Sequence, residues 1–470
     1  MKREGNTYAS GSGGKDKSLT PFQKYLSKLA LICDTQKGEC GRTMTALVCL
    51  KGTEGPEYIF TSNYRKETEL KETKSFLSNL LIFIGTNPDK LGAKPLQKQV
   101  LWRSLEFNFD KLEFYLKALT NALENCIASE NGRKLTDFQT IKQLHSLQEK
   151  ASFPRDIESS ENARTKCLSD CETLIKAIQA NKTGVFEKVL QSRTVEKDAN
   201  SADNWCKLRH YLGRLHSYRQ ASEIIVAAAT TWPDLFESPR IDFIRSAQKK
   251  HIPTPKTSNL SQIIPIALPE HEFRDFESDI AELRIYDLDE IINKQLQNRR
   301  IKTMIHGEVH LHNHLVQQGK TNPTDFWNDS MFIATSKPTC RLCQYYFNCS
   351  TNNFQVQTSH MNLYPKWRLP DIPDYQSSED RDLYEDLLQD IIEQMQHDTL
   401  QMLEQKISRG KTNDSRTDSH SRLSTTASYL GSGLSNLGAE RQGTSPRLPS
   451  PSSDVGESWI DIENGGYHAR

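Results

Sequence analysis

The sequence has no excess of charge of either sign. Its 470 residues include 60 Lys and Arg and 60 Asp and Glu, so the formal net charge is zero. Proteins held on nucleic acid by neutralisation of phosphates usually carry a clear basic excess. The balance therefore argues against that class as a whole, although it leaves room for a local basic groove.

Long apolar runs are also lacking, and hydrophobic residues make up only 36% of the chain, below the usual share for a globular protein. The longest run, residues 224–229, is far too short to span a bilayer, so we expect no association with a membrane. Residues 1–17 are rich in Gly, Ser and Lys without the apolar core of a targeting peptide, and residues 408–470 are rich in Ser, Thr and Gly. Both are expected to be disordered tails.

Cysteine is sparse as well. Ten cysteines are spread over the chain without a secretory signal, so we expect reduced thiols in the cytoplasm or nucleus rather than a disulfide framework. No internal repeat of fixed period is evident, which leaves a helical solenoid unsupported.

The first structured region combines a helix with a hairpin. Thr20 and Pro21 are typical of a helix start, and the apolar spacing that follows predicts a helix over residues 22–32. Two β-branched and apolar runs, 43–50 and 58–62, flank a turn with glycine at positions 52 and 55, which predicts a β-hairpin.

The middle of the chain has helical periodicity. Helices are predicted at 101–127, 135–149, 161–190, 202–229 and 277–297, with a proline-rich linker at 251–269. Further on, 353–362 is predicted to be a strand, 365–373 a loop and 380–407 a long acidic amphipathic helix.

The residues that carry chemistry lie between positions 306 and 343. His306-Gly307-Glu308 opens a helical pattern, residues 331–335 resemble a strand, and Cys340 and Cys343 follow Pro338. A catalytic zinc takes three protein ligands and leaves its fourth position to water, and His306, Cys340 and Cys343 meet that count. Cysteines three apart share a helical face, and the dipole at a helix start stabilises their thiolates.

Glu308 supplies the carboxylate that such a site needs besides its ligands. Residues two apart point to nearly opposite faces of a regular helix, so His306 and Glu308 can address one site only at the helix end. Zinc lowers the pKa of bound water toward neutrality, and Glu308 would shuttle the proton during attack by the zinc-bound hydroxide. His-x-Glu followed by Pro and Cys-x-x-Cys is the pattern of zinc deaminases, which convert an amino-substituted base to its oxo form.

These motifs resemble the cytidine deaminase-like superfamily. The form Ser336-Lys337-Pro338-Thr339-Cys340-Arg341-Leu342-Cys343, with downstream Ser359-His360 and a loop holding Trp367 and Pro370, is similar to its OTT-type branch. One departure is Thr339, because most of the superfamily has proline directly before the first cysteine. The resemblance implies a Zn2+ cofactor and a substrate base in a nucleoside, a nucleotide or a single-stranded nucleic acid.

The resemblance also implies a fold. Superfamily members place a helix and two strands before the His-x-Glu helix, and the second strand often ends in an asparagine that contacts the sugar; here that residue is Asn63. The expected fold is α/β, a three-layer cytidine deaminase-like core built from residues 18–64 and 301–407. Residues 65–300 would form a large all-α insertion, through which a protein partner could bind.

His360 and Trp367 are further expected substrate-binding residues. Lys366-Trp367-Arg368 alternates charge with an aromatic ring and could hold a nucleotide by stacking and phosphate contact. The alternative is a surface loop that the tryptophan anchors.

Two other metal sites remain open. Cys349 and His360 could complete Cys340 and Cys343 as a closed structural zinc site. His306, His310 and His314 share a helical face, as in metalloproteases, although Gly307 stands where a protease has Glu. A third hypothesis is a non-catalytic interaction protein that uses the deaminase-like fold as a scaffold.

Overall fold

The structure is a computed structural model. It describes residues 2–3, 19–35, 41–133, 137–182, 184–194, 196, 199–251, 267–268, 274–278, 281, 287, 289–290, 293–294, 302–371, 378–405 and 407–408. All of them lie in the first of two units, residues 1–420 and 421–470.

The predicted hairpin is confirmed as β2 (Thr45–Gly52) and β3 (Gly55–Ser62), which pair antiparallel. Its turn requires glycine at both ends. A Cβ on Gly52 would lie 2.7 Å from the carbonyl oxygen of Gly55, and Gly55 has a φ of +135°, a region that side chains rarely adopt.

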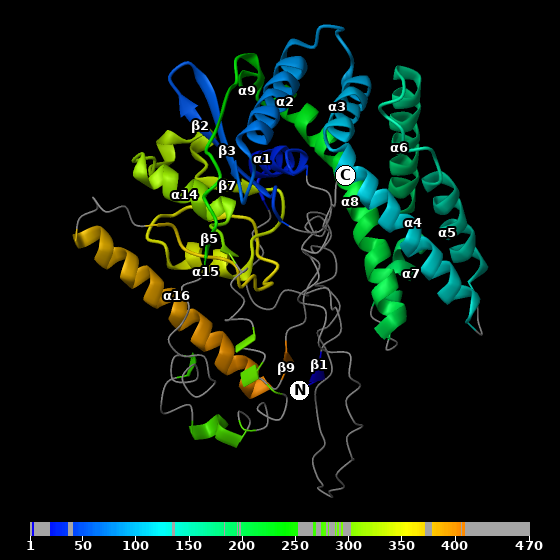
Figure 1. Ribbon diagram of the computed structural model, residues 1–470. Helices are drawn as coiled ribbons and strands as arrows, with labels where there is room; N and C mark the ends of the chain where they lie inside the picture. Colours follow the sequence, from blue (N-terminus) through cyan, green and yellow to red (C-terminus); the bar gives the residue numbers. More distant parts are fainter. Residues whose placement is uncertain are drawn as a thin grey trace, which may run out of the picture. The chain divides into compact units, whose positions relative to one another are not determined.

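A five-stranded mixed sheet grows from this hairpin, in the order β4-β3-β2-β7-β8. Figure 1 labels its strands β2, β3 and β7. The other strands are β4 (Arg240–Phe243), β7 (Phe332–Thr335) and β8 (Gln355–Val356). β7 runs antiparallel to β2, with Ala46 opposite Thr335, while β4 is parallel to β3 and β8 is parallel to β7. The hairpin and the strand before the cysteines are therefore direct neighbours.

The sheet separates two hydrophobic clusters. Leu47 and Cys49 of β2 face a cluster with α1 (Pro21–Ile32), whereas Ala46, Val48 and Leu50 face a cluster with α14 (Gly307–Gln317) and α15 (Arg341–Cys349). This alternation is the two-residue period of a strand covered on both faces. Helices thus lie on both sides of the sheet, and the predicted α/β class is confirmed. The predicted helix 22–32 is also confirmed, with Thr20 in a capping box.

Helices fill most of the segment between β3 and β4. They are α2 (Glu67–Thr86), α3 (Ala93–Phe107), α4 (Phe109–Asn131), α5 (Phe138–Ala151), α6 (Glu161–Asn181), α7 (Val185–Arg193), α8 (Ala199–Thr231) and α9 (Asp234–Glu237). The predictions for 135–149 and 202–229 are confirmed as α5 and α8, with ends that differ by a few residues.

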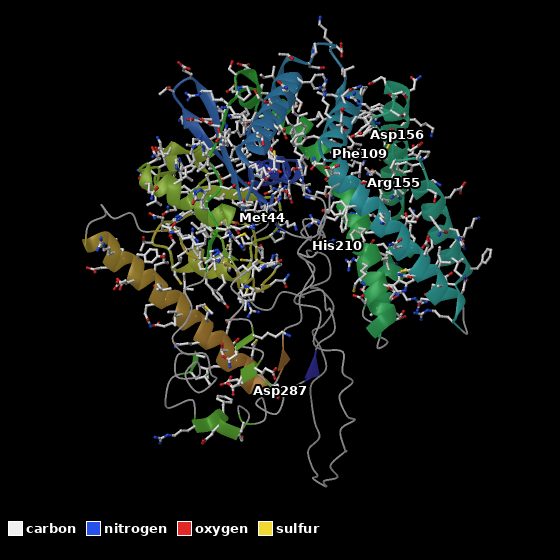
Figure 2. All side chains as sticks on the ribbon, viewed as in Figure 1. Met44, Phe109, Arg155, Asp156, His210 and Asp287 are labelled. Carbon is white, nitrogen blue, oxygen red and sulfur yellow. The ribbon has the colours of Figure 1, made fainter. Side chains whose placement is uncertain are left out.

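Two predicted helices are each broken in two. The helix expected at 101–127 is interrupted at Asn108, which precedes Phe109 (labelled in Figure 2) and has non-helical φ and ψ of −101° and 20°. The side-chain amide of the buried Asn108 donates to the carbonyl oxygen of Ile32, the last residue of α1, at 2.7 Å. The helix expected at 161–190 is split before Gly184, the N-cap of α7.

The expectation of an all-α insertion was wrong. β4 lies inside residues 65–300 and extends the sheet beside β3, with Ile241 buried. β5 (Lys250–His251) also lies there and pairs with β6 (Lys302–Thr303). The predicted linker 251–269 and helix 277–297 lie largely outside the described residues, which include a short 3₁₀ helix, η1 (Arg274–Phe276).

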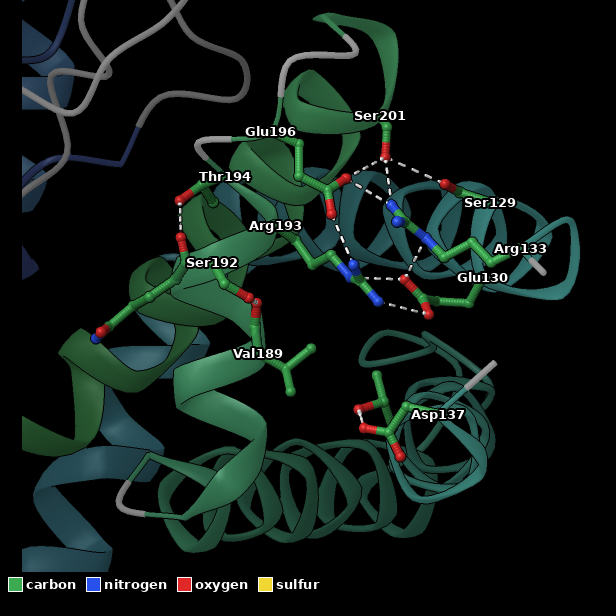
Figure 3. A network of polar contacts seen from close by, with 12 residues as sticks. Ser129, Glu130, Arg133, Asp137, Val189, Ser192, Arg193, Thr194, Glu196 and Ser201 are labelled. Atoms are coloured by element: carbon green, nitrogen blue, oxygen red, sulfur yellow. Dashed lines mark hydrogen bonds and ion pairs between the residues drawn. The ribbon is translucent and has the colours of Figure 1, made fainter. Parts of the chain in front are cut away.

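A closed ring of ion pairs joins the ends of α4 and α7 to the start of α8 (Figure 3). The fully buried carboxylate of Glu130 lies 2.9 Å from the Nε atoms of Arg133 and Arg193. Both arginines also form ion pairs with Glu196, and the hydroxyl of Ser201 donates to the carboxylate of Glu196. Two positive and two negative side chains therefore balance one another, which a buried group of charges requires.

The long helix predicted at 380–407 is confirmed. α16 (Ser378–Gln405) packs on α15, where the hydroxyl of Tyr345 donates to Asp398. Its predicted apolar stripe is only partly buried: Ile391 and Leu403 are covered, but Leu383 and Met395 are exposed. The strand predicted at 353–362 is only the two residues of β8, because the chain then turns back toward α15.

The remaining elements are short. They are η2 (Pro323–Asp325), η3 (Trp327–Asp329), and β1 (Lys2–Arg3), which pairs with β9 (Ile407–Ser408). Apart from those strand residues, the predicted tails lie outside the described part. Among the helices described, none combines the length and apolarity needed to cross a membrane.

Candidate metal centre

The three predicted ligands meet where α14 and α15 begin. His306 is the N-cap of α14, Cys340 is the N-cap of α15, and Cys343 lies in the first turn of α15. The Cys340 sulfur accepts the backbone N–H of Cys343 at 3.5 Å, in the position where a serine or aspartate oxygen usually caps a helix. The local fold of each helix start therefore orients its own ligand.

The spacing of the ligand atoms fits zinc. His306 Nδ1 lies 3.5 Å from Cys340 Sγ and 3.4 Å from Cys343 Sγ. Zn–N and Zn–S bonds of about 2.0–2.1 and 2.3 Å would place N and S at neighbouring tetrahedral corners about 3.6 Å apart. Within the described part of the chain, these three residues form the one group of metal-ligating side chains whose donor atoms all lie within 4.8 Å of one another.

Among the described residues, the donor atoms of the two alternative metal sites do not lie close together in this way. Cys349, at the far end of α15, lines a surface hollow with Asp390 and Glu393 of α16. His310 Nε2 lies 3.0 Å from the carbonyl oxygen of Arg245. The geometry therefore favours the set of His306, Cys340 and Cys343.

Burial and proximity shift the pKa values of the ligands. Burial alone would lower the pKa of His306, but the charge of the Cys340 sulfur and its hydrogen bond raise it. Burial opposes ionisation of Cys340, yet the hydrogen bond with Cys343 and the charge of His306 hold its pKa well below the ordinary value. Burial and the Cys340 sulfur raise the pKa of Cys343. Negative charge thus concentrates on Cys340, ready for a cation.

Glu308 lies beside the ligands without a partner of its own. It occupies the first turn of α14, is 1% exposed, and neither carboxylate oxygen has a hydrogen-bond partner among the described residues. Burial raises its pKa, and its charge acts on His306. His306 and Glu308 both lie at the start of α14, the one arrangement in which the sequence allowed them to address the same site. Burying a carboxylate without a partner costs free energy, so the position of Glu308 indicates that a ligand binds beside it.

Asn63 ties the hairpin to α14. Its Oδ1 accepts the backbone N–H of Gly307 at 2.7 Å, and its Nδ2 donates to the carbonyl oxygen of Gly41 at 2.8 Å. Its own N–H donates to the carbonyl oxygen of Met44, labelled in Figure 2, at 3.2 Å. Both ends of the carboxamide are therefore bound to backbone, and its contact with a sugar stays a prediction.

The comparison with known families agrees with the geometry. Residues 305–371 match the OTT_1508-like deaminase family. His306, Glu308, Cys340, Cys343, His360 and Trp367 all lie inside this deaminase segment, whereas Asn63 and the hairpin lie outside it. No curated protein and no solved structure matches the chain.

A loop of the deaminase segment folds back over the Cys340 turn. The backbone N–H of His360 donates to the carbonyl oxygen of Thr339, and that of Arg341 donates to the carbonyl oxygen of Asn362, both at 3.1 Å. The ring of Tyr364 packs edge to face on His306 and His360, with centroids 6.1 and 5.8 Å apart. Our sequence reasoning missed Tyr364, although it is the one tyrosine between the predicted His360 and Trp367.

Trp367 anchors this loop. It forms a β-bridge with Met304, two residues before His306, and packs half-buried against the cluster under α14. Arg368 is tied to Asp371 at 2.8 Å and to the carbonyl oxygen of Gln248 at 3.0 Å. These contacts favour the anchored-loop alternative for residues 366–368, and substrate binding by His360 or Trp367 stays a prediction.

Ser336 and Lys337, which precede the two cysteines, connect the site to Asp34. The Ser336 hydroxyl donates to Asp34 Oδ2 at 3.3 Å and accepts the N–H of Thr45 at 3.1 Å. Burial would raise the pKa of Asp34, but Lys111 of α4, 2.7 Å away, and Lys337 hold it well below the ordinary range. Asp34 therefore joins the cysteine-bearing segment to α4. Sequence reasoning missed this link because its members lie far apart in the chain.

Proposed function

We propose that the protein is a zinc-dependent hydrolytic deaminase of a nucleobase in a nucleoside, a nucleotide or a single-stranded nucleic acid. His306, Cys340 and Cys343 would hold Zn2+, and Glu308 would carry protons. One observation carries the proposal: three donor atoms within 4.8 Å of one another lie beside a buried carboxylate without a partner, inside a deaminase-family segment.

Zinc in this site would lower the pKa of water in its open coordination position and so supply a nucleophile near neutral pH. Glu308, whose pKa burial raises, would take one proton from the water and pass it to the ring nitrogen of the base. It would then take the second proton from the hydroxyl added to the ring carbon and pass it to the leaving amine. A C–O bond forms, the exocyclic C–N bond breaks, and ammonia leaves. Burial of Glu308 suits this task because a proton shuttle works best when its pKa is close to the operating pH.

The proposal includes the architecture and the surroundings of the site. Residues 18–64 and 301–407, together with β4, would form one cytidine deaminase-like core, into which the rest of residues 65–300 is inserted. The pairing of β2 with β7 and the bond between Asn63 and Gly307 support it. Asn63, His360 and Trp367 would contact the substrate. Each cysteine in the described part is a free thiol, which suits the cytoplasm or nucleus.

The first test is the metal content of the purified full-length chain. We expect one zinc per chain by plasma mass spectrometry and its loss in His306→Ala. The matched control is His314→Ala, because His314 lies on the same helix and outside the ligand group. A chain without zinc, or zinc that survives His306→Ala unchanged, would contradict the proposal.

The second test is release of ammonia from cytosine and adenine, their nucleosides and nucleotides, and single-stranded DNA and RNA. Release from at least one of them, lost together with zinc in His306→Ala, supports the deaminase. Bound zinc without release from any substrate would favour the non-catalytic scaffold, with the helical insertion as the surface for a protein partner.

A further inference from the structure

Residues 244–251 run beside the start of α14. The Thr61 hydroxyl at the end of β3 donates to the carbonyl oxygen of Ile244, and the backbone N–H of Arg65 donates to the hydroxyl of Ser246, both at 3.0 Å. On the other side, His310 of α14 contacts the carbonyl oxygen of Arg245. The segment is therefore fixed between the strand end that carries Asn63 and the helix that carries Glu308.

Positive side chains gather along this segment and its neighbours. We call the basic rim the set Arg245, Lys249, Lys250, Lys302 and Lys366. The last two join it through the backbone: Lys302 pairs with His251 in β5 and β6, and the N–H of Met304 donates to the carbonyl oxygen of Lys366 at 2.7 Å. The rim thus draws cations from three segments that flank the start of α14.

Acidic side chains neutralise only part of the basic rim. Glu67 lies 3.0 Å from Arg245, and Asp371 lies 2.7 Å from Lys250. Among the described residues, no carboxylate lies within ion-pair distance of the other three members. The chain as a whole has no net charge, so this local excess does not follow from composition.

An aromatic ring accompanies the cations. Tyr64 directly follows Asn63, its side chain is 38% exposed, and the ammonium of Lys249 lies 4.5 Å from its ring centre. Proteins that bind single strands combine such rings, on which bases stack, with cations that follow the phosphates. The bond between Asn63 and Gly307 places this ring next to the start of α14.

We propose that the basic rim and Tyr64 bind the phosphodiester chain of a single-stranded nucleic acid, so that an unpaired base reaches Glu308. This inference rests on the proposed deaminase function and narrows its substrate class. A nucleoside has no phosphate and a nucleotide has phosphates at one position only, whereas the basic rim offers cations from three segments. A duplex fits less well, because stacking on Tyr64 and deamination both require an unpaired base.

The test measures binding of fluorescent 20-nucleotide single strands, DNA and RNA, to the full-length chain by anisotropy at several salt concentrations. The triple variant Lys249→Glu, Lys302→Glu, Lys366→Glu should bind about tenfold or more weakly at low salt. Its slope of log affinity against log salt should fall by about two, since each phosphate contact on a single strand contributes about 0.7.

The control triple variant is Lys94→Glu, Lys117→Glu, Lys188→Glu, which changes three exposed lysines of α3, α4 and α7. Its net charge equals that of the first variant, so it should bind as the wild type does. Tyr64→Ala should lose about five- to 150-fold in affinity without a change in slope, and Tyr64→Phe should lose little.

Three outcomes would overturn the inference: no binding of either single strand at low salt, equal losses in both triple variants, or equally tight binding of a duplex of the same length. Each leaves the proposed function standing if zinc-dependent ammonia release from nucleosides or nucleotides persists. Single-strand binding that depends on the basic rim, with ammonia released from the bound strand, supports the inference. Such binding without release from any strand would show that no base reaches Glu308 and would contradict it.

Discussion

The side-chain oxygen of Asn63 accepts a hydrogen bond from the backbone N–H of Gly307 at 2.7 Å, across 244 positions of sequence. Gly307 is the first residue of α14, between the predicted ligand His306 and the predicted proton carrier Glu308. The first N–H groups of a helix have no partner within the helix. Asn63, which follows β3 of the hairpin, accepts one of them and so caps α14. It therefore acts as a positioning residue for α14.

Replacing Asn63 by Ala should destabilise the protein and slow the reaction with every substrate. The variant leaves the N–H of Gly307 and the carbonyl oxygen of Gly41 without Asn63, which is 4% exposed. We expect the free energy of unfolding to fall by about 2 kcal/mol or more, since each unsatisfied buried group costs about 1–3 kcal/mol. Urea unfolding followed by circular dichroism measures it.

Asn121→Ala, at an exposed position of α4, is the control and should leave both stability and kcat unchanged. A positioning role predicts a lower kcat even for a free base. If instead only the KM of nucleosides rises and stability is unchanged, the positioning role is wrong.

Glu308→Gln should keep the metal and lose turnover. The amide has the same shape but cannot carry the proton, so kcat should fall by about 10²- to 10⁴-fold, the usual contribution of a positioned acid or base. Zinc content, measured in the same preparation, should stay at the wild-type level. Glu393→Gln, on an exposed face of α16, should be fully active; wild-type activity in Glu308→Gln would dismiss Glu308 as the shuttle.

His312 should make the protein less stable in mild acid. Its Nδ1 lies 2.8 Å from the Tyr346 hydroxyl, so it links α14 to α15, and burial lowers its pKa from 6.5 to about 4. The folded state then binds fewer protons than the unfolded state, so stability is lost as pH falls from about 6.5 toward 4. The linkage relation gives a loss of about 2 kcal/mol between pH 7 and pH 5.

Urea unfolding at pH 7 and pH 5 tests this contribution. His312→Gln keeps a polar partner for Tyr346 but does not titrate, so its stability should fall less over this interval than that of the wild type. His145→Gln, on an exposed part of α5, should follow the wild type. An unchanged pH dependence in His312→Gln would show that His312 is not the group responsible.

Gly85→Ala should destabilise the contact between α2 and α9. An added Cβ would lie 2.9 Å from both Cβ and the carbonyl carbon of Phe236, so the backbone must move. We expect the thermal midpoint to fall and a cost of about 1–3 kcal/mol, typical of overpacking, despite the higher helix propensity of alanine. At Gly92 an added Cβ meets nothing within 4 Å, and Gly92→Ala should melt close to the wild type.

Local features of the fold could be predicted from the sequence. Thr20 and Pro21 mark the start of α1, and Gly52 and Gly55 mark the hairpin, because caps and turns depend on residues within a few positions. The group of three candidate ligands could be predicted for the same reason, since His306 and the cysteines belong to short motifs whose spacing fits helix starts.

Features that depend on distant partners could not be predicted. β4 has only four residues, and its pairing with β3 across about 180 positions is what makes it a strand. The break at Asn108 depends on the carbonyl oxygen of Ile32. Asn63 was predicted only through the resemblance, and its hydrogen bond to Gly307 joins residues 244 positions apart in the sequence.

The sheet also constrains the order in which the chain can mature. Ala46, Val48 and Leu50 of β2 pack against residues of α14 and α15, which leave the ribosome more than two hundred residues later. At a synthesis rate of about 5–20 residues per second, this face of the hairpin stays exposed for roughly 10 to 50 s before α14 and α15 can cover it. A nascent chain truncated before α14 would carry that bare apolar surface permanently, which makes it a natural substrate for chaperones and proteases.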